Sequence, residues 1–215
     1  MPEAAMAPDA VRCGPYRIGL TGNIATGKST VGRMLVDLGA EMVDADGVAH
    51  GVMAPAGSAY AGIVEAFGPE VLTPEGEIDR RRLGRIVFAD PAALRRLESL
   101  THPAVIAEVN RRTAESTAPV VVVEAIKLLE SGMAGDYDAI WVTTCSETDQ
   151  LSRLMDGRGL SRDAAMRRIR AQSPQEEKLA CADVVIHTGV SWAETRAEVW
   201  AAWLDIPWTD TPPAR

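Results

Sequence analysis

Residues 22–30 read Gly22-Asn23-Ile24-Ala25-Thr26-Gly27-Lys28-Ser29-Thr30, and this stretch decides the fold. Its spacing, G-x-x-x-x-G-K-S, is the pattern of a phosphate-binding loop. Glycines allow backbone N–H groups to turn towards an anion, and the helix that follows adds the positive end of its dipole. In such a loop Lys28 reaches the β- and γ-phosphates, and the Ser29 hydroxyl ligates Mg²⁺. The stretch therefore predicts a nucleoside triphosphate site.

The residues on either side of the loop fit this interpretation. Ile18 and Leu20 belong to a short β-like run that ends at Thr21. Residues 30–38 carry apolar side chains at positions 31, 34, 35 and 38, which is the spacing of a helix face. A phosphate-binding loop follows a strand and opens a helix, so this context argues against a chance match.

The composition is that of one medium-sized domain with a real core. The chain has 215 residues, 47% of them hydrophobic, and a net charge of −8. The acidic balance argues against a nucleic-acid partner, which would require a basic face. No apolar run approaches the roughly 18 residues of a membrane span, so we expect no membrane partner. We expect a monomer or a weak homo-oligomer.

The cysteines and the two ends of the chain indicate a cytoplasmic protein. Cys13, Cys145 and Cys181 are widely spaced, which is typical of free thiols in a reducing compartment. Residues 1–15 lack the basic start and apolar centre of a secretory signal, and we interpret them as a flexible extension. Residues 205–215 are expected to form a flexible tail, which leaves one folded domain over 16–204.

Hydrophobic patterning predicts an α/β fold with a parallel sheet flanked by helices. Besides the strand before the loop, strands are expected at 41–43, 119–123, 138–143 and 183–187. Helices are expected at 59–67, 80–89, 91–113, 148–155 and 192–204, with a further helix opening at Ser161. Two helical excursions interrupt the alternation of strands and helices. The one at about 55–117 could cover a second substrate, and the one around Gly157 could close as a lid.

Acidic residues follow two of the predicted strands. Asp44 and Asp46 close the second strand, and Glu124 ends the continuous run of valines at 120–123. Open α/β sheets bind ligands beyond the carboxyl ends of their strands, so all three are candidate site residues. Glu124 is placed to hold Mg²⁺ or its water. The alternative for Asp44 or Asp46 is that it caps a helix.

Cations are concentrated in the helical excursion. Arg80 and Arg81 begin a run that also includes Arg82 and Arg85. Arginine pairs with phosphate through two parallel hydrogen bonds, so some of these residues could hold an anionic substrate. For most of them a solvated helix face is the simpler interpretation. His102, which precedes Pro103, could belong to a rigid part of the site. The alternative is that it is a structural or helix-capping histidine.

Taken together, the motifs resemble those of the dephospho-coenzyme A kinase family. The resemblance runs from about Tyr16 to Leu204. Its segments include, in order, the loop, Val43-Asp44-Ala45-Asp46 with His50, Ile78-Asp79-Arg80-Arg81, His102-Pro103, Leu128-Leu129-Glu130-Ser131-Gly132, Arg153-Leu154-Met155, Gln172-Ser173-Pro174, Lys178-Leu179 and Ala182-Asp183-Val184-Val185-Ile186.

The resemblance implies a P-loop kinase core that transfers the γ-phosphate of ATP, with Mg²⁺, to the ribose 3′-hydroxyl of dephospho-CoA. It implies that Asp46 is the base or the group that orients the 3′-hydroxyl, that Lys28 holds the γ-phosphate, and that Ser29 and Glu124 serve the metal. We hypothesise that Arg158, displaced by one residue from the arginine of the family's lid, still reaches the phosphates and assists the transfer. The resemblance also implies that the segment at about 55–117 is the substrate-binding insert and that the segment at about 153–172 is the lid. Implied substrate contacts are Thr21, Asp44, Asp46, His50, Arg80, Arg81 and His102.

The chain departs from the family pattern at four places. The third strand ends in Glu124 where the family often has Asp, and Lys127 stands within the segment that is usually Pro-Leu-Leu. The lid has Gly157-Arg158 where an Arg-Asp pair is common, and Thr188 replaces an Asn after the last strand. Two alternatives stay open: another small-molecule kinase with a P-loop, acting on nucleosides or nucleotides, or a nucleotide-binding regulator without turnover.

Overall fold

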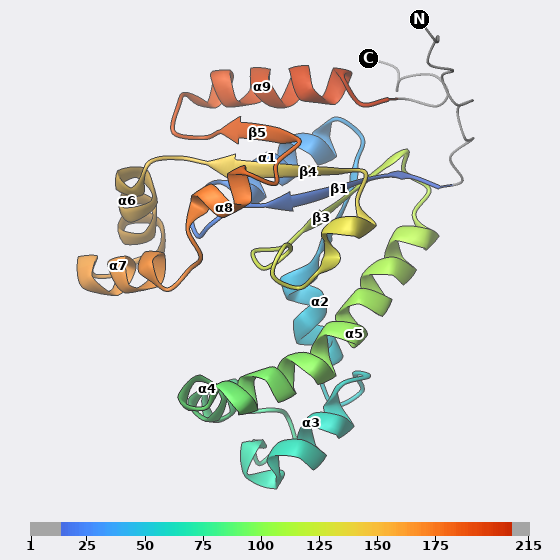
Figure 1. Cartoon of the computed structure of the whole chain (residues 1–215), viewed down its shortest axis with the longest axis vertical. Helices are drawn as coiled ribbons and strands as arrows, with labels where there is room; N and C mark the ends of the chain where they lie inside the picture. The colour runs from blue at the N-terminus through green and yellow to red at the C-terminus, as the bar shows by residue number, and fades with distance from the viewer. Residues whose placement is uncertain (1–13, 208–215) are drawn as a thin grey trace, which may run out of the picture.

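A computed structural model describes residues 14–207 of the chain. Most of the predicted extension at 1–15 and of the predicted tail at 205–215 lies outside the described residues. The described chain forms a central sheet with helices packed on both of its faces (Figure 1).

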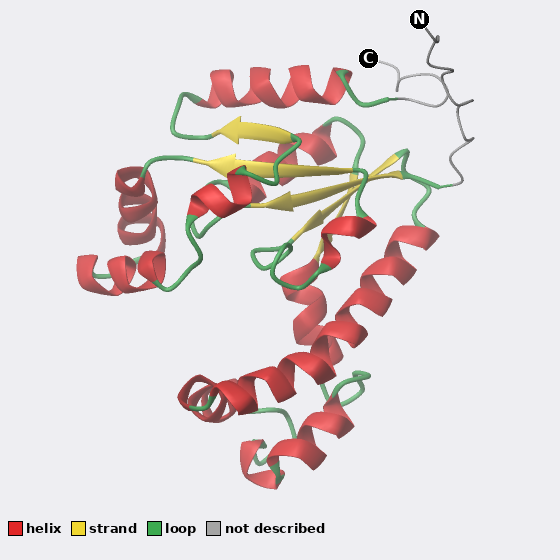
Figure 2. Cartoon of the chain, in the orientation of Figure 1, coloured by secondary structure: helices red, strands yellow, loops and turns green. Residues whose placement is uncertain are grey.

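The sheet has five strands, all of them parallel (Figure 2). They are β1 (Tyr16–Thr21), β2 (Glu41–Asp44), β3 (Val120–Glu124), β4 (Ala139–Thr144) and β5 (Val184–His187), in the spatial order β2-β3-β1-β4-β5. The predicted α/β class with a parallel sheet is confirmed. Register places Asp44 beside Glu124 and Glu124 beside Leu20, so the acidic strand ends meet at the carboxyl edge of the sheet.

The described residues outside the sheet include nine α-helices and two short 3₁₀ helices. The α-helices are α1 (Lys28–Asp37), α2 (Ala45–Val52), α3 (Tyr60–Phe67), α4 (Arg80–Ala89), α5 (Pro91–Glu115), α6 (Glu147–Arg158), α7 (Arg162–Arg170), α8 (Gln175–Leu179) and α9 (Trp192–Leu204). The 3₁₀ helices are η1 (Pro69–Val71) and η2 (Met133–Asp136). No described helix has both the length and the apolar character that crossing a membrane requires.

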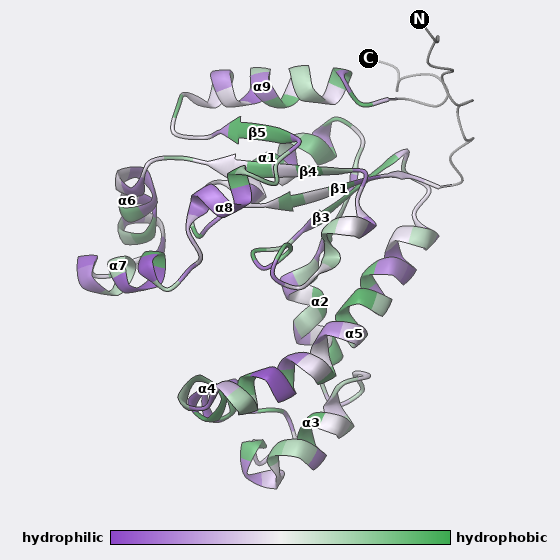
Figure 3. Ribbon diagram, in the orientation of Figure 1, coloured by the Kyte–Doolittle hydropathy of each residue, from purple (hydrophilic) through white to green (hydrophobic). Residues whose placement is uncertain are grey.

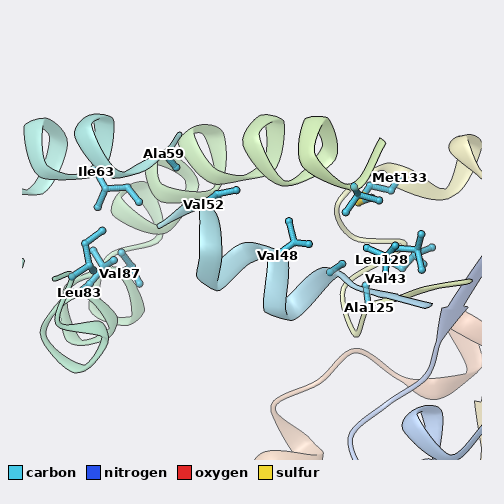
Figure 4. Close-up of a cluster of buried hydrophobic side chains, with 14 of the residues drawn as sticks. Val43, Val48, Val52, Ala59, Ile63, Leu83, Val87, Ala125, Leu128 and Met133 are labelled. Carbon is cyan, nitrogen blue, oxygen red and sulfur yellow. The ribbon is translucent and has the colours of Figure 1, made fainter. Parts of the chain in front are cut away.

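The valine run of β3 explains how both faces of the sheet are covered. Val120 and Val122 join one hydrophobic cluster with side chains of α1 and α9. Val121 and Val123 join the opposite cluster, which α2 and α5 complete. Successive strand residues point to opposite faces, so a strand buried on both faces must be apolar throughout. Figure 3 colours the ribbon by hydropathy, and Figure 4 shows side chains of the second cluster, among them Val43, Val48 and Leu128.

Two helical units extend away from the sheet. The first follows β2 and returns to β3, and its helices α3 and α4 and the first part of α5 lie well below the strands in Figure 1. The second is the pair α6 and α7, which follows β4 and packs on itself through a small cluster around Leu154 and Ala165. Both units follow strands at the carboxyl edge of the sheet.

The boundaries of α6 differ from the sequence prediction, which ended the helix at Met155 and broke it at Gly157. The helix instead includes Gly157 and Arg158 and ends at Gly159, whose φ of +62° is left-handed. A glycine in the last helical turn costs only about 1 kcal/mol, whereas a left-handed residue terminates the helix. Ser146 opens α6 with a capping box.

Candidate active site

The phosphate-binding loop lies between β1 and α1, as its sequence predicts. Gly27 is the N-cap of α1 and has φ +91°, and Gly22 has φ +146°. A Cβ on Gly22 would lie 2.5 Å from Thr143 Oγ1 and 2.6 Å from the Thr143 carbonyl oxygen. Only glycine fits this position, both because of its backbone conformation and because of its close neighbour.

Three glutamines fix the first part of the loop. Gln175 Oε1 accepts a hydrogen bond from the Asn23 backbone N–H at 3.0 Å, and Gln172 Oε1 accepts one from the Ile24 N–H at 2.6 Å. Gln150 donates to the Ile24 carbonyl at 3.0 Å. Among the described residues no hydrogen bond is recorded from the backbone N–H groups of Gly27 or Lys28, so these donors are available to an anion.

Lys28 is buried and folds back over the loop. Its ammonium donates to the Gly22 carbonyl at 2.9 Å and to the Asn23 carbonyl at 3.2 Å. Burial lowers its pKa to about 8, against the attraction of Glu124 and Asp46. The hydrogen-bond acceptors that hold the ammonium at the loop are therefore both neutral. A bound phosphate would supply the negative charge that balances it.

A cavity of about 620 Å³ opens in front of the loop; we call it the loop cavity. The loop supplies Ile24, Ala25, Gly27, Lys28, Ser29 and Thr30 to its lining. Its acidic wall comes from Asp44, Asp46 and Glu124. Helix α6 adds Arg153, Gly157 and Arg158 to the lining. A helix N-terminus, a lysine and arginines around one polar hollow form a site for a polyphosphate.

Ser29 and Glu124, both predicted to serve a metal, are in contact. The Ser29 hydroxyl donates to Glu124 Oε1 at 3.0 Å. Desolvation raises the pKa of the Glu124 carboxyl, against the Ser29 hydrogen bond and the charge of Lys28. No group of three or more His, Cys, Asp or Glu in 14–207 could hold a metal by itself. The pair suits Mg²⁺, which takes one or two protein oxygens together with phosphates and water.

Asp44 and Asp46 occupy the turn from β2 into α2. Asp44 is the N-cap residue of α2, but its side chain makes no capping hydrogen bond. Asp46 lies in the first turn of α2, on the wall of the loop cavity. Partial desolvation and the charge of Asp44 raise the pKa of Asp46, while Lys28 and His50 lower it. A raised pKa makes a carboxylate a stronger base.

A second cavity, of about 260 Å³, lies between α2 and α5; we call it the apolar cavity. Its walls are mainly hydrophobic and include Met53, Leu97 and Phe88, the last of which is 83% exposed. His102, a predicted substrate contact, lines it. Asp46 lines both cavities, so one acidic residue borders a polar site and an apolar site at once.

Other residues predicted from the sequence lie outside the two linings. Thr21 is fully buried, and its hydroxyl donates to the Ile126 carbonyl at 3.3 Å. His50, Arg80 and Arg81 are exposed and line neither cavity. Gly22, Asn23 and Thr26 shape the loop from behind; the Thr26 hydroxyl binds the Asn23 carbonyl at 2.8 Å. Substrate contact by these side chains stays a prediction.

The two arginines of α6 have different surroundings. Arg153 is tied down: its guanidinium donates to the Ala25 carbonyl at 3.0 Å and to the Thr188 hydroxyl at 3.1 Å. It also donates to the Thr188 carbonyl. Arg158 is exposed at the end of the helix on the rim of the loop cavity. The first arginine therefore shapes the loop, whereas the second is available to a ligand.

The buried ammonium of Lys178 was not identified as functional from the sequence. Lys178 is 2% exposed and donates to the Ile126 carbonyl at 3.0 Å and to Glu130 at 2.7 Å. Together with Gln172 and Gln175 it ties the chain after α7 to the loop and to the end of β3. The sequence signal that could have pointed to this role is the polar stretch after α7, which contains Gln172 and Gln175 and is interrupted by Pro174.

Comparison with known proteins agrees with this geometry. The family model described as dephospho-CoA kinase matches residues 16–194. The dephospho-CoA kinase of Geobacter metallireducens is 46% identical over 189 residues, which cover 86% of this chain and 94% of that protein.

Solved structures show the same similarity. A crystal structure from Thermus thermophilus superposes with a TM-score of 0.81 at 32% identity, covering 89% of this chain and 97% of the other. The dephospho-CoA kinase from Campylobacter jejuni gives a TM-score of 0.62 at 31% identity, covering 88% and 96%. The predicted P-loop kinase fold is confirmed.

Proposed function

The chain belongs to the dephospho-CoA kinase family, and we propose how its own residues carry out the reaction of that family. The reaction is the ATP-dependent phosphorylation of dephospho-CoA, the final step of coenzyme A biosynthesis. The single observation that carries our assignment is that Asp46 lines both cavities. In phosphoryl transfer the protein mainly positions two oxygens in line and stabilises spreading charge.

ATP is the donor, and we assign its triphosphate to the loop cavity. The backbone N–H groups of Gly27 and Lys28 and the N-terminal end of α1 support this assignment. The Lys28 ammonium then exchanges the loop carbonyls for phosphate oxygens. As charge spreads over the γ-phosphoryl oxygens in the transition state, this contact strengthens.

Mg²⁺ belongs to the same assignment, with Ser29 and Glu124 as the residues that would hold it. Their mutual contact at 3.0 Å and their position on the wall of the loop cavity support this. The ion, when bound, neutralises charge on the phosphates. Glu124 also holds the Ser29 hydroxyl in one orientation, so the pair is ordered before the nucleotide arrives.

Dephospho-CoA is the acceptor, and we assign part of it to the apolar cavity with its ribose 3′-hydroxyl at Asp46. Asp46 takes the hydroxyl proton as the 3′-oxygen bonds to the γ-phosphorus and the bond from that phosphorus to the bridging oxygen of ADP breaks. The raised pKa of Asp46 supports its role as base. The hydrophobic lining supports binding of the uncharged parts of the acceptor.

Arg158 completes the assignment as the lid residue. Its position on the rim of the loop cavity, at the end of α6, supports closure over the phosphates. A closed lid strengthens the electrostatic contacts and excludes water, which would otherwise compete as the acceptor. The glycines on both sides of Arg158 give the adjoining backbone freedom to adjust.

The deciding experiment measures ADP release by the purified full chain with ATP, Mg²⁺ and dephospho-CoA, and locates the new phosphate on the product. We expect turnover with dephospho-CoA and a phosphate on the 3′-oxygen, and no turnover by the Lys28→Met variant. Adenosine and nucleoside monophosphates serve as comparison acceptors. Faster turnover with one of these, or ATP binding without ADP release, would contradict the proposal.

We also assign the protein to the cytoplasm, as a monomer or a weak homo-oligomer. Cys145 and Cys181 are free thiols, which supports a reducing compartment. Size-exclusion chromatography with light scattering over a range of concentrations tests the oligomeric state.

A further inference from the structure

We propose that Lys127 binds the diphosphate of dephospho-CoA and thereby selects this acceptor over those that lack a diphosphate. The inference rests on the proposed function, because it takes the apolar cavity to be the acceptor site. Lys127 has no part in the reaction steps assigned above. Dephospho-CoA carries its diphosphate on the 5′-carbon of the same ribose whose 3′-hydroxyl is phosphorylated.

The chain after β3 divides the two cavities. Glu124 and Ile126 line the loop cavity, whereas Ala125 and Lys127 line the apolar cavity. The four consecutive residues thus alternate between the donor side and the acceptor side. Lys127 therefore faces the acceptor side and not the triphosphate, although it is only three residues from Glu124.

Lys127 is the cation available on the acceptor side. Among the described residues that line the apolar cavity, the charged side chains are Asp46, Glu98 and Lys127, with His102 as the one histidine. Asp46 and Glu98 both repel a diphosphate. Without Lys127 this lining would present two carboxylates to an acceptor that carries two negative charges.

The present partner of Lys127 holds it only weakly. Its ammonium lies 3.4 Å from Glu98 Oε1, and the two side chains are 66% and 32% exposed. Exposed ion pairs of this kind contribute little to the free energy of folding, because solvent screens the charges and both side chains lose rotamer entropy. An ammonium has three donors on a flexible stem, so Lys127 can turn from Glu98 to phosphate oxygens at the mouth of the cavity.

The test compares Lys127→Met with Lys127→Arg in the full-length enzyme. We expect Lys127→Met to raise the KM for dephospho-CoA about 10- to 100-fold, the effect of losing a hydrogen-bonded charge contact, with kcat and the KM for ATP little changed. Lys127→Arg keeps the charge and should retain most of the affinity. Glu98→Gln frees Lys127 and removes a repelling charge, so it should lower the KM for dephospho-CoA.

Adenosine provides the matched ligand, because it has the ribose and the base but no diphosphate. Its inhibition constant against dephospho-CoA should be the same in the wild type and in Lys127→Met. Arg96→Met, which removes an exposed charge from α5 outside both cavities, controls for net charge and should leave the KM unchanged.

Three results would overturn the inference: an unchanged KM in Lys127→Met, an equal loss of adenosine and dephospho-CoA binding, or an equal loss in Lys127→Arg. A thermal melt of each variant separates misfolding from lost contact, and Lys127→Gln, which is also uncharged, takes the place of Lys127→Met if that variant unfolds. Failure of the proposed function looks different, because the wild type itself would then not phosphorylate dephospho-CoA.

Discussion

The Ser29 hydroxyl donates a 3.0 Å hydrogen bond to the carboxylate of Glu124, although 95 positions separate the two residues in the chain. The contact joins the first turn of α1 to the last residue of β3. It exists because β3 pairs with β1, which places the end of one strand beside the loop that leaves the other. Several testable properties of the site depend on this arrangement.

Removing the charge of Glu124 should raise the Mg²⁺ requirement. We expect Glu124→Gln to need about 10- to 100-fold more Mg²⁺ for half-maximal turnover, the size of effect seen when residues that support a metal are lost. Glu124→Asp keeps a carboxylate on a shorter side chain, so its Mg²⁺ requirement should rise less than that of Glu124→Gln. Titration of activity with Mg²⁺ at saturating ATP makes the measurement, and superimposable curves for Glu124→Gln and the wild type would contradict the assignment.

Asp46→Asn should retain ATP binding while lowering kcat about 10²- to 10⁴-fold, because the acceptor hydroxyl loses its base. In the wild type, kcat should fall as the pH drops through the raised pKa of Asp46, since protonation removes the base. Asp44→Asn removes one cause of that raised pKa, so the fall should move to lower pH. A pH–rate profile of the wild type and of Asp44→Asn checks the shift, and a nearly normal rate in Asp46→Asn would contradict the assignment of the base.

Binding of ATP at pH 9 should take up protons. The pKa of Lys28 is about 8 in the free protein, so much of this side chain is neutral at that pH. The negative triphosphate favours the ammonium and raises its pKa, and the protonation that follows accompanies binding. Calorimetry in buffers of different ionisation enthalpy measures the uptake. Lys28→Arg, which stays charged, should show none; equal uptake in both proteins would exclude Lys28 as its source.

Substitution of Arg158 and substitution of Arg153 should affect different properties of the enzyme. Arg158→Ala should lower kcat more than it raises the KM for dephospho-CoA, since we propose that its guanidinium binds the transferring phosphate. Arg153→Ala should instead lower thermal stability and ATP affinity, because its guanidinium holds the carbonyls of Ala25 and Thr188. Steady-state kinetics and a thermal melt separate the two. An unchanged kcat in Arg158→Ala would assign the lid role elsewhere.

Gly22→Ala should abolish ATP binding, whereas Gly39→Ala should lower the stability of the fold and leave ATP binding intact. Both glycines have positive φ, +146° and +106°, but a Cβ on Gly22 would meet Thr143 at 2.5 Å while one on Gly39 meets nothing within 4 Å. Gly39→Ala should therefore cost about 1–2 kcal/mol, the strain of a left-handed alanine. Denaturant unfolding and ATP titration measure both, and equal behaviour of the two variants would contradict this steric explanation.

The elements that rest on short-range patterns were predictable. The loop motif, the valine run of β3 and helix α9 all lie where the sequence predicts them, because apolar periodicity and turn chemistry are local properties. The meeting of Asp44 with Glu124 at one edge also followed, since parallel strands share a carboxyl end.

The contacts that depend on tertiary packing were not predictable. Gln172 and Gln175 have no periodic signature, and their roles appear only when the chain after α7 lies against the loop. The end of α6 was missed because a helix-disfavouring glycine, Gly157, precedes the residue that actually terminates the helix. Which cavity Lys127 faces depends on the turn after β3, and its sequence is compatible with either direction.

The route of the chain between two adjacent strands has an evolutionary consequence. Residues 45–119 leave the sheet at the carboxyl end of β2 and rejoin it at the amino end of the neighbouring parallel strand β3, so they form one continuous excursion between two adjacent strands. Such an excursion can be lengthened, shortened or exchanged without altering β1, the loop or α1. The architecture therefore allows a kinase to acquire a new acceptor by recombination while it inherits its nucleotide machinery intact.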